Sequence, residues 1–296
     1  MPKLGAGDKV AIVAPSAKIG GKAEIENALN YIKELGLEPV LGKHLLEQRR
    51  YMAGTDKDRA EDINTAFADQ EIKALFCVRA AAGATRILPL IDYEAARENP
   101  KPVIGFCDNA ALQVALLEKA NIISYNGFVF TYDCKNGNLD AKIRSSLENL
   151  LQGKKIKITS GATKRGGKAK GELIAVNLSV LLYLAGTPYF PDLRGKILLI
   201  EDVHERMHKI DLMLQQLKQQ PHFAELAGVI FGQFTDCSGD DEDGTLEDCI
   251  DDFLQDTDFP VIHNFDFGHT PSRYVLPLGS QVSLDADNAS LEILSY

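Results

Sequence analysis

Apolar strands alternate with amphipathic helices along the first half of this chain, and this alternation restricts the folds that the chain can adopt. The segment KVAIVAPS (9–16) predicts a strand and a turn, KAEIENALNYIKELG (22–36) a helix, and LEPVLG (37–42) a second strand. Two more apolar strands follow at 72–79 and 102–107. Strands that alternate with helices in this way indicate βαβ units. We therefore predict an α/β fold with a mostly parallel N-terminal sheet, Rossmann-like or flavodoxin-like, covered by helices on both faces.

The second half of the chain predicts a further, mixed α/β domain. A tract rich in Gly and Lys, TKRGGKAKG (163–171), reads as a flexible connector, and the apolar segments after it mix strands with helices. We expect an N-terminal domain over residues 1–135, a linker over 136–167 and a C-terminal domain over 168–296. Because ligands of parallel sheets bind beyond the carboxyl ends of the strands, functional side chains are expected there.

Charge and composition narrow the range of partners. The 296 residues carry a formal net charge of −10, so a basic face for nucleic acid is not expected. No segment approaches the roughly 18 consecutive apolar residues of a membrane span, and we expect a cytoplasmic protein with no membrane partner. The five cysteines include no C-x-x-C pair, which argues against a disulfide framework or a zinc ribbon. A small peptide or another small molecule is the partner that this composition favours.

A cysteine lies at the corner between the strand VIG (103–105) and the helix that begins near Ala110. A side chain at such a corner is lifted out of the sheet, and the positive end of the following helix lowers the pKa of a thiol. Cys107 is therefore a candidate nucleophile. The alternative is a small residue packed beneath the helix, because free cysteines are often buried.

A cysteine nucleophile needs a base and a group that orients the base. His269 is the candidate base, because FGHTPSRYVLPLG places it in a loop with glycines and prolines on both sides. Glu201 is the candidate orienting acid, because an acid at the end of the apolar strand ILLIEDV must find a partner. Spacing alone does not show that the three residues meet.

The segment HERMH offers a competing, metal-based chemistry. His204 and His208 match H-E-x-x-H, which on a helix would bind Zn²⁺ with Glu205 as the base. The motif follows a strand directly and lacks a third ligand, so we expect two solvent-facing imidazoles on an amphipathic helix. No metal and no other cofactor is expected, and a zinc metallopeptidase is the minor alternative.

Several blocks of the chain, taken together, resemble one protein family. They run in order from GDKVAIVAPS through KPVIGFCDNAAL and ILLIEDVHERMHKID to FGHTPSRYVLPLG. In this order and spacing they resemble the LD-carboxypeptidases, serine peptidases that include murein tetrapeptide carboxypeptidases and the microcin C immunity proteins. The resemblance matches Glu201 and His269 to the family's catalytic pair, and Cys107 to its nucleophilic serine.

The resemblance also implies a substrate and an assembly. It implies a homodimer that cleaves a terminal D-alanine from cytoplasmic murein tetrapeptides during wall recycling. Backbone N–H groups at Asp108 and Ala81 would receive the oxyanion, and Arg79 would bind the substrate carboxylate. Asn177, which matches the family's G-G-N-L segment, would lie among the substrate-binding residues.

Some family positions differ in this chain. The family's R-G-G-Y-G loop is here Arg79-Ala80-Ala81-Ala82-Gly83, so two glycines and a tyrosine have become alanines. Alanine restricts the approach of backbone N–H groups to a ligand and disfavours a positive φ. Two interpretations stay open. The chain is either a Cys-His-Glu hydrolase or a diverged homologue. The diverged homologue either has lost hydrolysis and only binds a peptide-like ligand, or acts on another acyl group.

Overall fold

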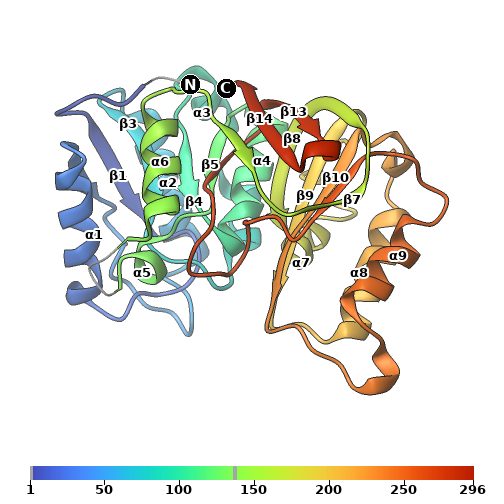
Figure 1. Cartoon of the computed structure of the whole chain (residues 1–296). Helices are drawn as coiled ribbons and strands as arrows, with labels where there is room; N and C mark the ends of the chain where they lie inside the picture. The colour runs from blue at the N-terminus through green and yellow to red at the C-terminus, as the bar shows by residue number, and fades with distance from the viewer. Residues whose placement is uncertain (1–2, 136–138) are drawn as a thin grey trace. The chain divides into compact units, whose positions relative to one another are not determined.

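The computed structural model describes residues 3–135 and 139–296, which form two compact units (Figure 1). Unit 1 holds the chain up to Lys154 together with Tyr274–Gly279 and Tyr296. Unit 2 holds Lys155–Arg273 and Ser280–Ser295. The chain therefore passes between the units more than once, whereas the sequence predicted a single linker.

Unit 1 is built on a six-stranded sheet with the order β12-β5-β4-β3-β1-β2. Five of its strands are parallel, and β12 pairs with β5 in the antiparallel sense. The parallel part has the order 2-1-3-4-5, which is the flavodoxin-like one of the two predicted alternatives. The strands are β1 (Lys9–Val13), β2 (Glu38–Leu41), β3 (Ile72–Cys77), β4 (Val103–Gly105), β5 (Ser124–Asn126) and β12 (Leu276–Leu278).

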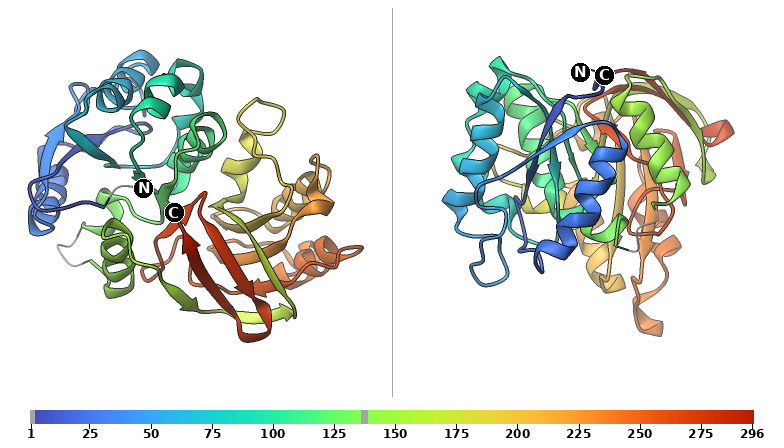
Figure 2. Two further views of the ribbon diagram at one scale, coloured as in Figure 1. Left: turned by 90° about the horizontal axis from the view of Figure 1, so that it is seen from above. Right: turned by 90° about the vertical axis from the view of Figure 1, so that its left-hand side faces the viewer.

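Helices cover this sheet in two sets (Figure 2). In one set α2, α3 and α4 pack side by side, and in the other α1 packs against α5. Almost every residue of α4 is buried, which explains why its apolar positions extend around the whole helix. The helices are α1 (Lys22–Glu34), α2 (Asp56–Ala68), α3 (Tyr93–Glu98), α4 (Ala110–Ala120), α5 (Phe130–Asp133) and α6 (Ala141–Leu151), with 3₁₀ turns η1 (Ala84–Arg86), η2 (Leu88–Leu90) and η3 (Cys107–Asn109).

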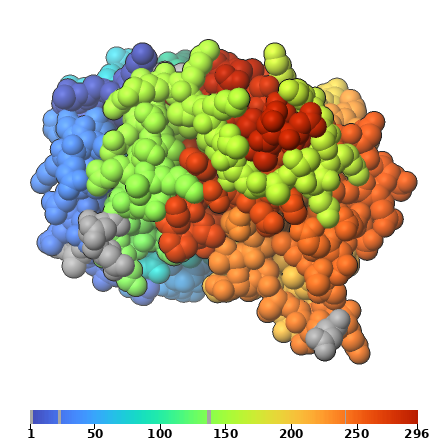
Figure 3. All heavy atoms as spheres, viewed as in Figure 1, coloured from blue at the N-terminus to red at the C-terminus, as the bar shows by residue number. Residues whose placement is uncertain are grey.

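Unit 2 is built on an eight-stranded mixed sheet with the order β6-β14-β13-β8-β9-β10-β11-β7. Its centre, β8 to β11, is parallel, and antiparallel strands extend it on both sides. The strands are β6 (Lys157–Thr159), β7 (Ala162–Arg165), β8 (Lys168–Asn177), β9 (Lys196–Val203), β10 (Gly228–Thr235), β11 (Val261–His263), β13 (Gln281–Asp285) and β14 (Ser290–Ser295). In the space-filling view the β13–β14 hairpin lies at the surface of this unit (Figure 3).

The helices of unit 2 follow its parallel strands. Apolar side chains of α8 and α9 are buried between the two helices and the sheet, which gives both helices one polar face. The helices are α7 (Leu178–Tyr183), α8 (Met207–Lys218) and α9 (Leu246–Leu254), with 3₁₀ turns η4 (Phe223–Glu225), η5 (Asp241–Asp243) and η6 (Ala286–Asn288). In the described part of the chain, no helix combines the length and the apolar character needed to cross a membrane.

The expected linker over 136–167 differs from what the structure shows. Residues 136–138, where it begins, lie outside the described residues. Helix α6 then belongs to unit 1, where the Ser146 hydroxyl accepts a hydrogen bond from the Val275 N–H at 2.9 Å. The tract 163–171 is not a flexible connector, because β7 pairs with β11 and β8 pairs with both β9 and β13.

Candidate active site

Cys107 lies where the chain turns from β4 into the helix α4. It opens the short 3₁₀ turn η3 and has φ +57°, in the left-handed region that residues other than glycine rarely adopt. Strain of this kind at a strand-to-helix turn is typical of a nucleophile elbow. The Cys107 residue is half-buried, so it is not the fully enclosed thiol that the alternative interpretation required.

The other four cysteines lie in environments that disfavour a thiolate. Burial raises the pKa of Cys77 and of Cys249, raises that of Cys134 to about 12 and raises that of Cys237 to about 11. Of these four, Cys237 is half-buried and the rest are buried. At neutral pH these thiols are protonated, so none of the four suits a nucleophilic role.

Glu201 and His269 form the pair that the sequence predicted. The Nδ1 atom of His269 lies 2.8 Å from Oε2 of Glu201. The Glu201 side chain is completely buried in β9, and the His269 side chain is 15% exposed. Because a carboxylate accepts the Nδ1–H, the neutral imidazole carries its lone pair on Nε2. This arrangement fixes the tautomer of a general base.

The backbone around the pair explains its position. Strand β10 carries a bulge between Phe231 and Phe234, opposite the end of β9. Gln233 lies in this bulge, and its N–H donates to the Phe267 carbonyl at 2.8 Å, which ties the His269 loop to the sheet. Gly268 has φ +138°, and a Cβ atom there would lie 2.8 Å from the Gln233 carbonyl oxygen. Glycine is therefore required immediately before the histidine.

One atom of the pair lacks a hydrogen-bond partner. Oε1 of Glu201 is buried and accepts no hydrogen bond, while Oε2 binds His269. A buried carboxylate with one unsatisfied oxygen is costly, and such groups are typical of functional sites. The adjacent Asp202 is satisfied by contrast, because it accepts hydrogen bonds from the Asn177 amide and the Ser179 and Val203 N–H groups. Burial raises the pKa of Asp202.

Asn177 is placed by the helix that it caps. Its Oδ1 accepts the Val180 N–H at 3.1 Å at the start of α7, and its amide donates to Asp202 at 3.0 Å. The side chain is buried. These bonds show how the asparagine orders the start of α7.

The loop after β3 carries the other predicted residues. Ala81 is exposed and has φ +143°, so an alanine adopts a backbone conformation that favours glycine. The Arg79 side chain is 39% exposed, and its guanidinium lies 3.9 Å from the Glu24 carboxylate. Asp108 is buried beside the elbow, and its carboxylate accepts the Ala84 N–H at 2.8 Å.

The structure also reveals polar residues near the elbow that the sequence analysis missed. Ser16 follows β1, and Arg59 projects from α2; both are buried and hydrogen-bonded to neighbouring loops. A serine directly after an apolar strand is a signal that could have identified Ser16, because the carboxyl ends of parallel strands share one edge. Arg59 offers no such signal, because an arginine within a helix usually faces water.

The HERMH segment does not have the geometry of a zinc site. His204 precedes α8, is 74% exposed and lies 3.9 Å from Asp236. His208 lies within α8, is 51% exposed and faces Asp243 at 3.3 Å. The expectation that both imidazoles lie on one helix is wrong, because a positive φ of +59° at His204 turns the chain before the helix begins. The zinc metallopeptidase reading therefore loses its structural basis.

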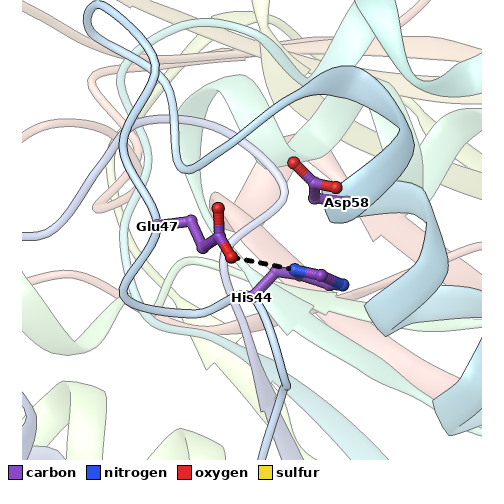
Figure 4. A group of neighbouring side chains, drawn as sticks. All are labelled: His44, Glu47 and Asp58. Atoms are coloured by element: carbon purple, nitrogen blue, oxygen red, sulfur yellow. Dashed lines mark hydrogen bonds and ion pairs between the residues drawn. The ribbon is translucent and has the colours of Figure 1, made fainter.

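A different cluster of potential metal ligands lies in unit 1 (Figure 4). His44, Glu47 and Asp58 are the one group of three such residues found in residues 3–135 and 139–296. The imidazole lies 3.4 Å from Glu47 and 3.5 Å from Glu61, and the Asp58 carboxylate accepts the Thr55 N–H at 2.7 Å. Neighbouring groups therefore account for each member of the cluster, and we assign no metal to it.

The predicted triad is divided between the two units. Glu201 and His269 belong to unit 2, where they are hydrogen-bonded, and Cys107 belongs to unit 1. The hydrogen-bonded pair is thus a feature of unit 2 alone.

Comparison with known proteins identifies the family. The LD-carboxypeptidase N-terminal domain matches residues 10–127, and the LD-carboxypeptidase C-terminal domain matches residues 170–284. The "Probable murein peptide carboxypeptidase" of Bacillus subtilis (strain 168) is 31% identical over 288 residues, which are 95% of this chain and 90% of the relative. The microcin C7 self-immunity protein MccF of Escherichia coli is 25% identical over 325 residues, 98% of this chain and 94% of the relative.

The fold agrees with the same assignment. The crystal structure of muramoyltetrapeptide carboxypeptidase from Oxalobacter formigenes superposes with a TM-score of 0.90 at 24% identity, covering 97% of this chain and 99% of that one. The mixed α/β architecture predicted from the sequence is confirmed. The N-terminal match includes the elbow at Cys107, and the C-terminal match includes the Glu201–His269 pair. The chain belongs to the LD-carboxypeptidase family, a family of carboxypeptidase-type peptidases.

Proposed function

We propose that this protein is a cysteine-dependent LD-carboxypeptidase in which Cys107, His269 and Glu201 act together. The hydrogen bond of 2.8 Å between the buried Glu201 carboxylate and His269 carries the proposal, because it prepares an imidazole to accept a proton at Nε2. The strained, half-buried position of Cys107 supports it. The chain reaches Tyr274 of unit 1 five positions after His269, so the base lies close in sequence to the unit that carries the thiol.

The reaction follows from these groups. His269 Nε2 takes the thiol proton, and the thiolate of Cys107 attacks the scissile carbonyl carbon, forming the C–S bond and an oxyanion. Backbone N–H groups of Asp108 and of the Ala80–Ala81 turn receive the oxyanion. Each such donor typically contributes on the order of a hundredfold in rate.

Collapse of the tetrahedral intermediate breaks the C–N bond. The imidazolium of His269 protonates the leaving amine, so that an amino acid departs and a thioester remains. Water then attacks the thioester while His269 takes its proton, and the thiol of Cys107 is restored as the acid product leaves. Glu201 stabilises the imidazolium in both halves of the cycle.

The proposed substrate is a murein tetrapeptide that loses its terminal D-alanine. The relation to the B. subtilis murein peptide carboxypeptidase supports this choice. Arg79 is the proposed partner of the terminal carboxylate, because it follows β3 and its guanidinium is accessible. Asn177 is a further proposed contact. We propose that the reaction takes place in the cytoplasm during wall recycling, and that the protein acts as a homodimer.

A diverged homologue is the second candidate function. The φ of +143° at Ala81 favours it, because a strained alanine replaces a glycine in the loop expected to stabilise the oxyanion. The relation to MccF supports a different acyl substrate. In this case the site binds a peptide-like ligand without cleaving the L,D-linked amide.

An assay of the hydrolysis of an L,D-linked tetrapeptide, in which the released D-alanine is measured, separates these functions. Cys107→Ala and His269→Ala should each lower kcat by at least about a thousandfold, whereas Cys107→Ser should retain part of the wild-type activity. Cys237→Ala is the matched control, because Cys237 is the other half-buried cysteine, and it should leave hydrolysis unchanged. Arg79→Ala should raise KM. EDTA should have no effect.

Other results would reject the proposal. Wild-type activity that survives Cys107→Ala would remove the cysteine from the mechanism. Binding of the tetrapeptide without cleavage by the wild type would establish the diverged homologue. Activity lost with EDTA and restored by Zn²⁺ would return a metal to the mechanism.

A further inference from the structure

The residue after the proposed nucleophile has a buried carboxylate that joins two loops. Oδ2 of Asp108 accepts the Ser16 hydroxyl at 2.5 Å and the Ala84 N–H at 2.8 Å. All of these polar groups are buried. Hydrogen bonds to an ionised acceptor are stronger than neutral ones, and their strength increases away from water. The carboxylate therefore links the elbow firmly to the loop after β3.

Asn109, the next residue, holds the opposite end of the same loop. Its amide donates to the Arg79 carbonyl at 3.3 Å. Two consecutive elbow residues thus contact the loop at Arg79 and at Ala84. The residues between these two contacts include Ala81.

Arg59, which projects from α2, also holds the loop after β3. Its guanidinium donates to the Gly83 carbonyl at 2.8 Å and to the Pro15 carbonyl at 2.5 Å, and it is paired with Asp56. The Arg59 side chain is buried, so it holds the loop through these contacts with protein groups and not through water. Arg59 and Asp108 together connect the segments that follow β1, β3 and β4.

A strained loop needs such support. A non-glycine residue with φ +143° is held at a cost of about 1–3 kcal/mol and persists only where the surroundings impose it. The bonds at Arg79, Gly83 and Ala84 are the constraints that the structure provides. Without them, Ala81 would relax to a negative φ and its N–H group would turn.

We propose that the Asp108 side chain is a positioning residue, which fixes the Arg79–Gly83 loop against the Cys107 elbow so that the loop presents its N–H groups to the oxyanion. The inference rests on the proposed function and assigns to the carboxylate a task separate from that of the Asp108 backbone N–H. Its effect should fall on kcat and not on KM, because an oxyanion exists in the transition state and not in the bound substrate.

Asp108→Ala and Asp108→Asn test the proposal in the full-length protein. The alanine variant removes the acceptor, and kcat for the tetrapeptide should fall by about a hundredfold with KM within threefold of the wild type. The asparagine variant retains an acceptor oxygen, so it should recover part of the lost rate. Iodoacetamide should label Cys107 in both variants at least as fast as in the wild type, since a nearby negative charge has been removed.

Asp62→Ala is the matched control. Asp62 is also buried in unit 1, and its carboxylate accepts the His44 N–H at 3.1 Å after β2, which is three strands from β4 in the sheet order. This variant should show a comparable loss of stability and an unchanged kcat. If Asp108→Ala and Asp62→Ala lower kcat to the same extent, Asp108 has only a structural role and the proposal is overturned.

Amide hydrogen exchange provides a readout that does not need activity. Peptides covering residues 79–86 should exchange faster in Asp108→Ala than in the wild type or in Asp62→Ala, with the largest change at Ala84. Unchanged exchange there would overturn the proposal. If the wild type does not cleave the tetrapeptide, the proposed function fails, and the exchange measurement still decides whether Asp108 positions the loop.

Discussion

Two loops of this protein share an unusual backbone angle but differ in the residue that adopts it. Gly268 in unit 2 has φ +138°, and Ala81 in unit 1 has φ +143°. A Cβ atom at Gly268 would collide with the carbonyl oxygen of Gln233, whereas Ala81 is exposed. Crowding therefore imposes glycine in the histidine loop. In the exposed loop an alanine fits without collision and carries only the conformational cost.

The largest effect on stability and on kcat is expected from a substitution at Gly268. Gly268→Ala adds a Cβ atom 2.8 Å from the Gln233 carbonyl oxygen, so the loop must shift and take His269 with it. We expect the free energy of unfolding to fall by about 2–4 kcal/mol and kcat to fall by about a hundredfold. Chemical denaturation and tetrapeptide hydrolysis measure the two effects.

Gly186→Ala is the control for that variant. Gly186 also lies in unit 2 with a positive φ of +77°, but no atom lies within 4 Å of the Cβ position. We expect a loss of about 1 kcal/mol and no change in kcat. Equal effects of the two variants on kcat would show that crowding at Gly268 does not position the histidine.

The two half-buried cysteines, one in each unit, should differ in their reactivity toward alkylation. Cys107 and Cys237 are both half-buried, but burial raises the pKa of Cys237 to about 11. We expect iodoacetamide to label Cys107 at least about tenfold faster than Cys237 at pH 7.5, as followed by peptide mass spectrometry. His269→Ala should slow the labelling of Cys107. Equal rates at both cysteines would argue against an activated thiol at the elbow.

The smallest effect is expected at Ala81. Ala81→Gly removes a strain of about 1–3 kcal/mol and gives the unfolded chain more freedom, worth about 0.4–1 kcal/mol, so a net gain of about 1 kcal/mol in the free energy of unfolding is expected. Ala82→Gly is the control, because Ala82 does not have a positive φ, and it should destabilise. A loss of stability in Ala81→Gly would mean that the alanine is not strained.

The sequence predicted the parallel sheet of unit 1 because its strands and helices follow one another with clear periodicity. It failed at the tract 163–171, where glycines and lysines suggested a connector. Strands β7 and β8 form there because β11, β9 and β13 supply their hydrogen-bond partners from far along the chain. Such distant pairing overrides local composition.

The candidate site shows the same division between residues that a sequence can indicate and residues that it cannot. Glu201 and His269 could be named as candidates because a buried acid after an apolar strand needs a partner, although their spacing did not show that they meet; in the structure they are hydrogen-bonded. Arg59 and the side-chain role of Asp108 could not be found in this way. Their partners are mostly backbone groups of other segments, such as the Gly83 carbonyl and the Ala84 N–H, and backbone groups leave no mark in a sequence.

The crossing of the chain between the units has a consequence for how such a gene can be divided. Strand β12 forms the outer edge of the first sheet beside β5, yet it is encoded after almost all of unit 2. A gene fragment that stopped at Lys154 would produce a sheet with β5 as a bare edge, and bare edges recruit strands from other chains. Recombination that exchanged one half for another would have to carry this three-residue strand with it.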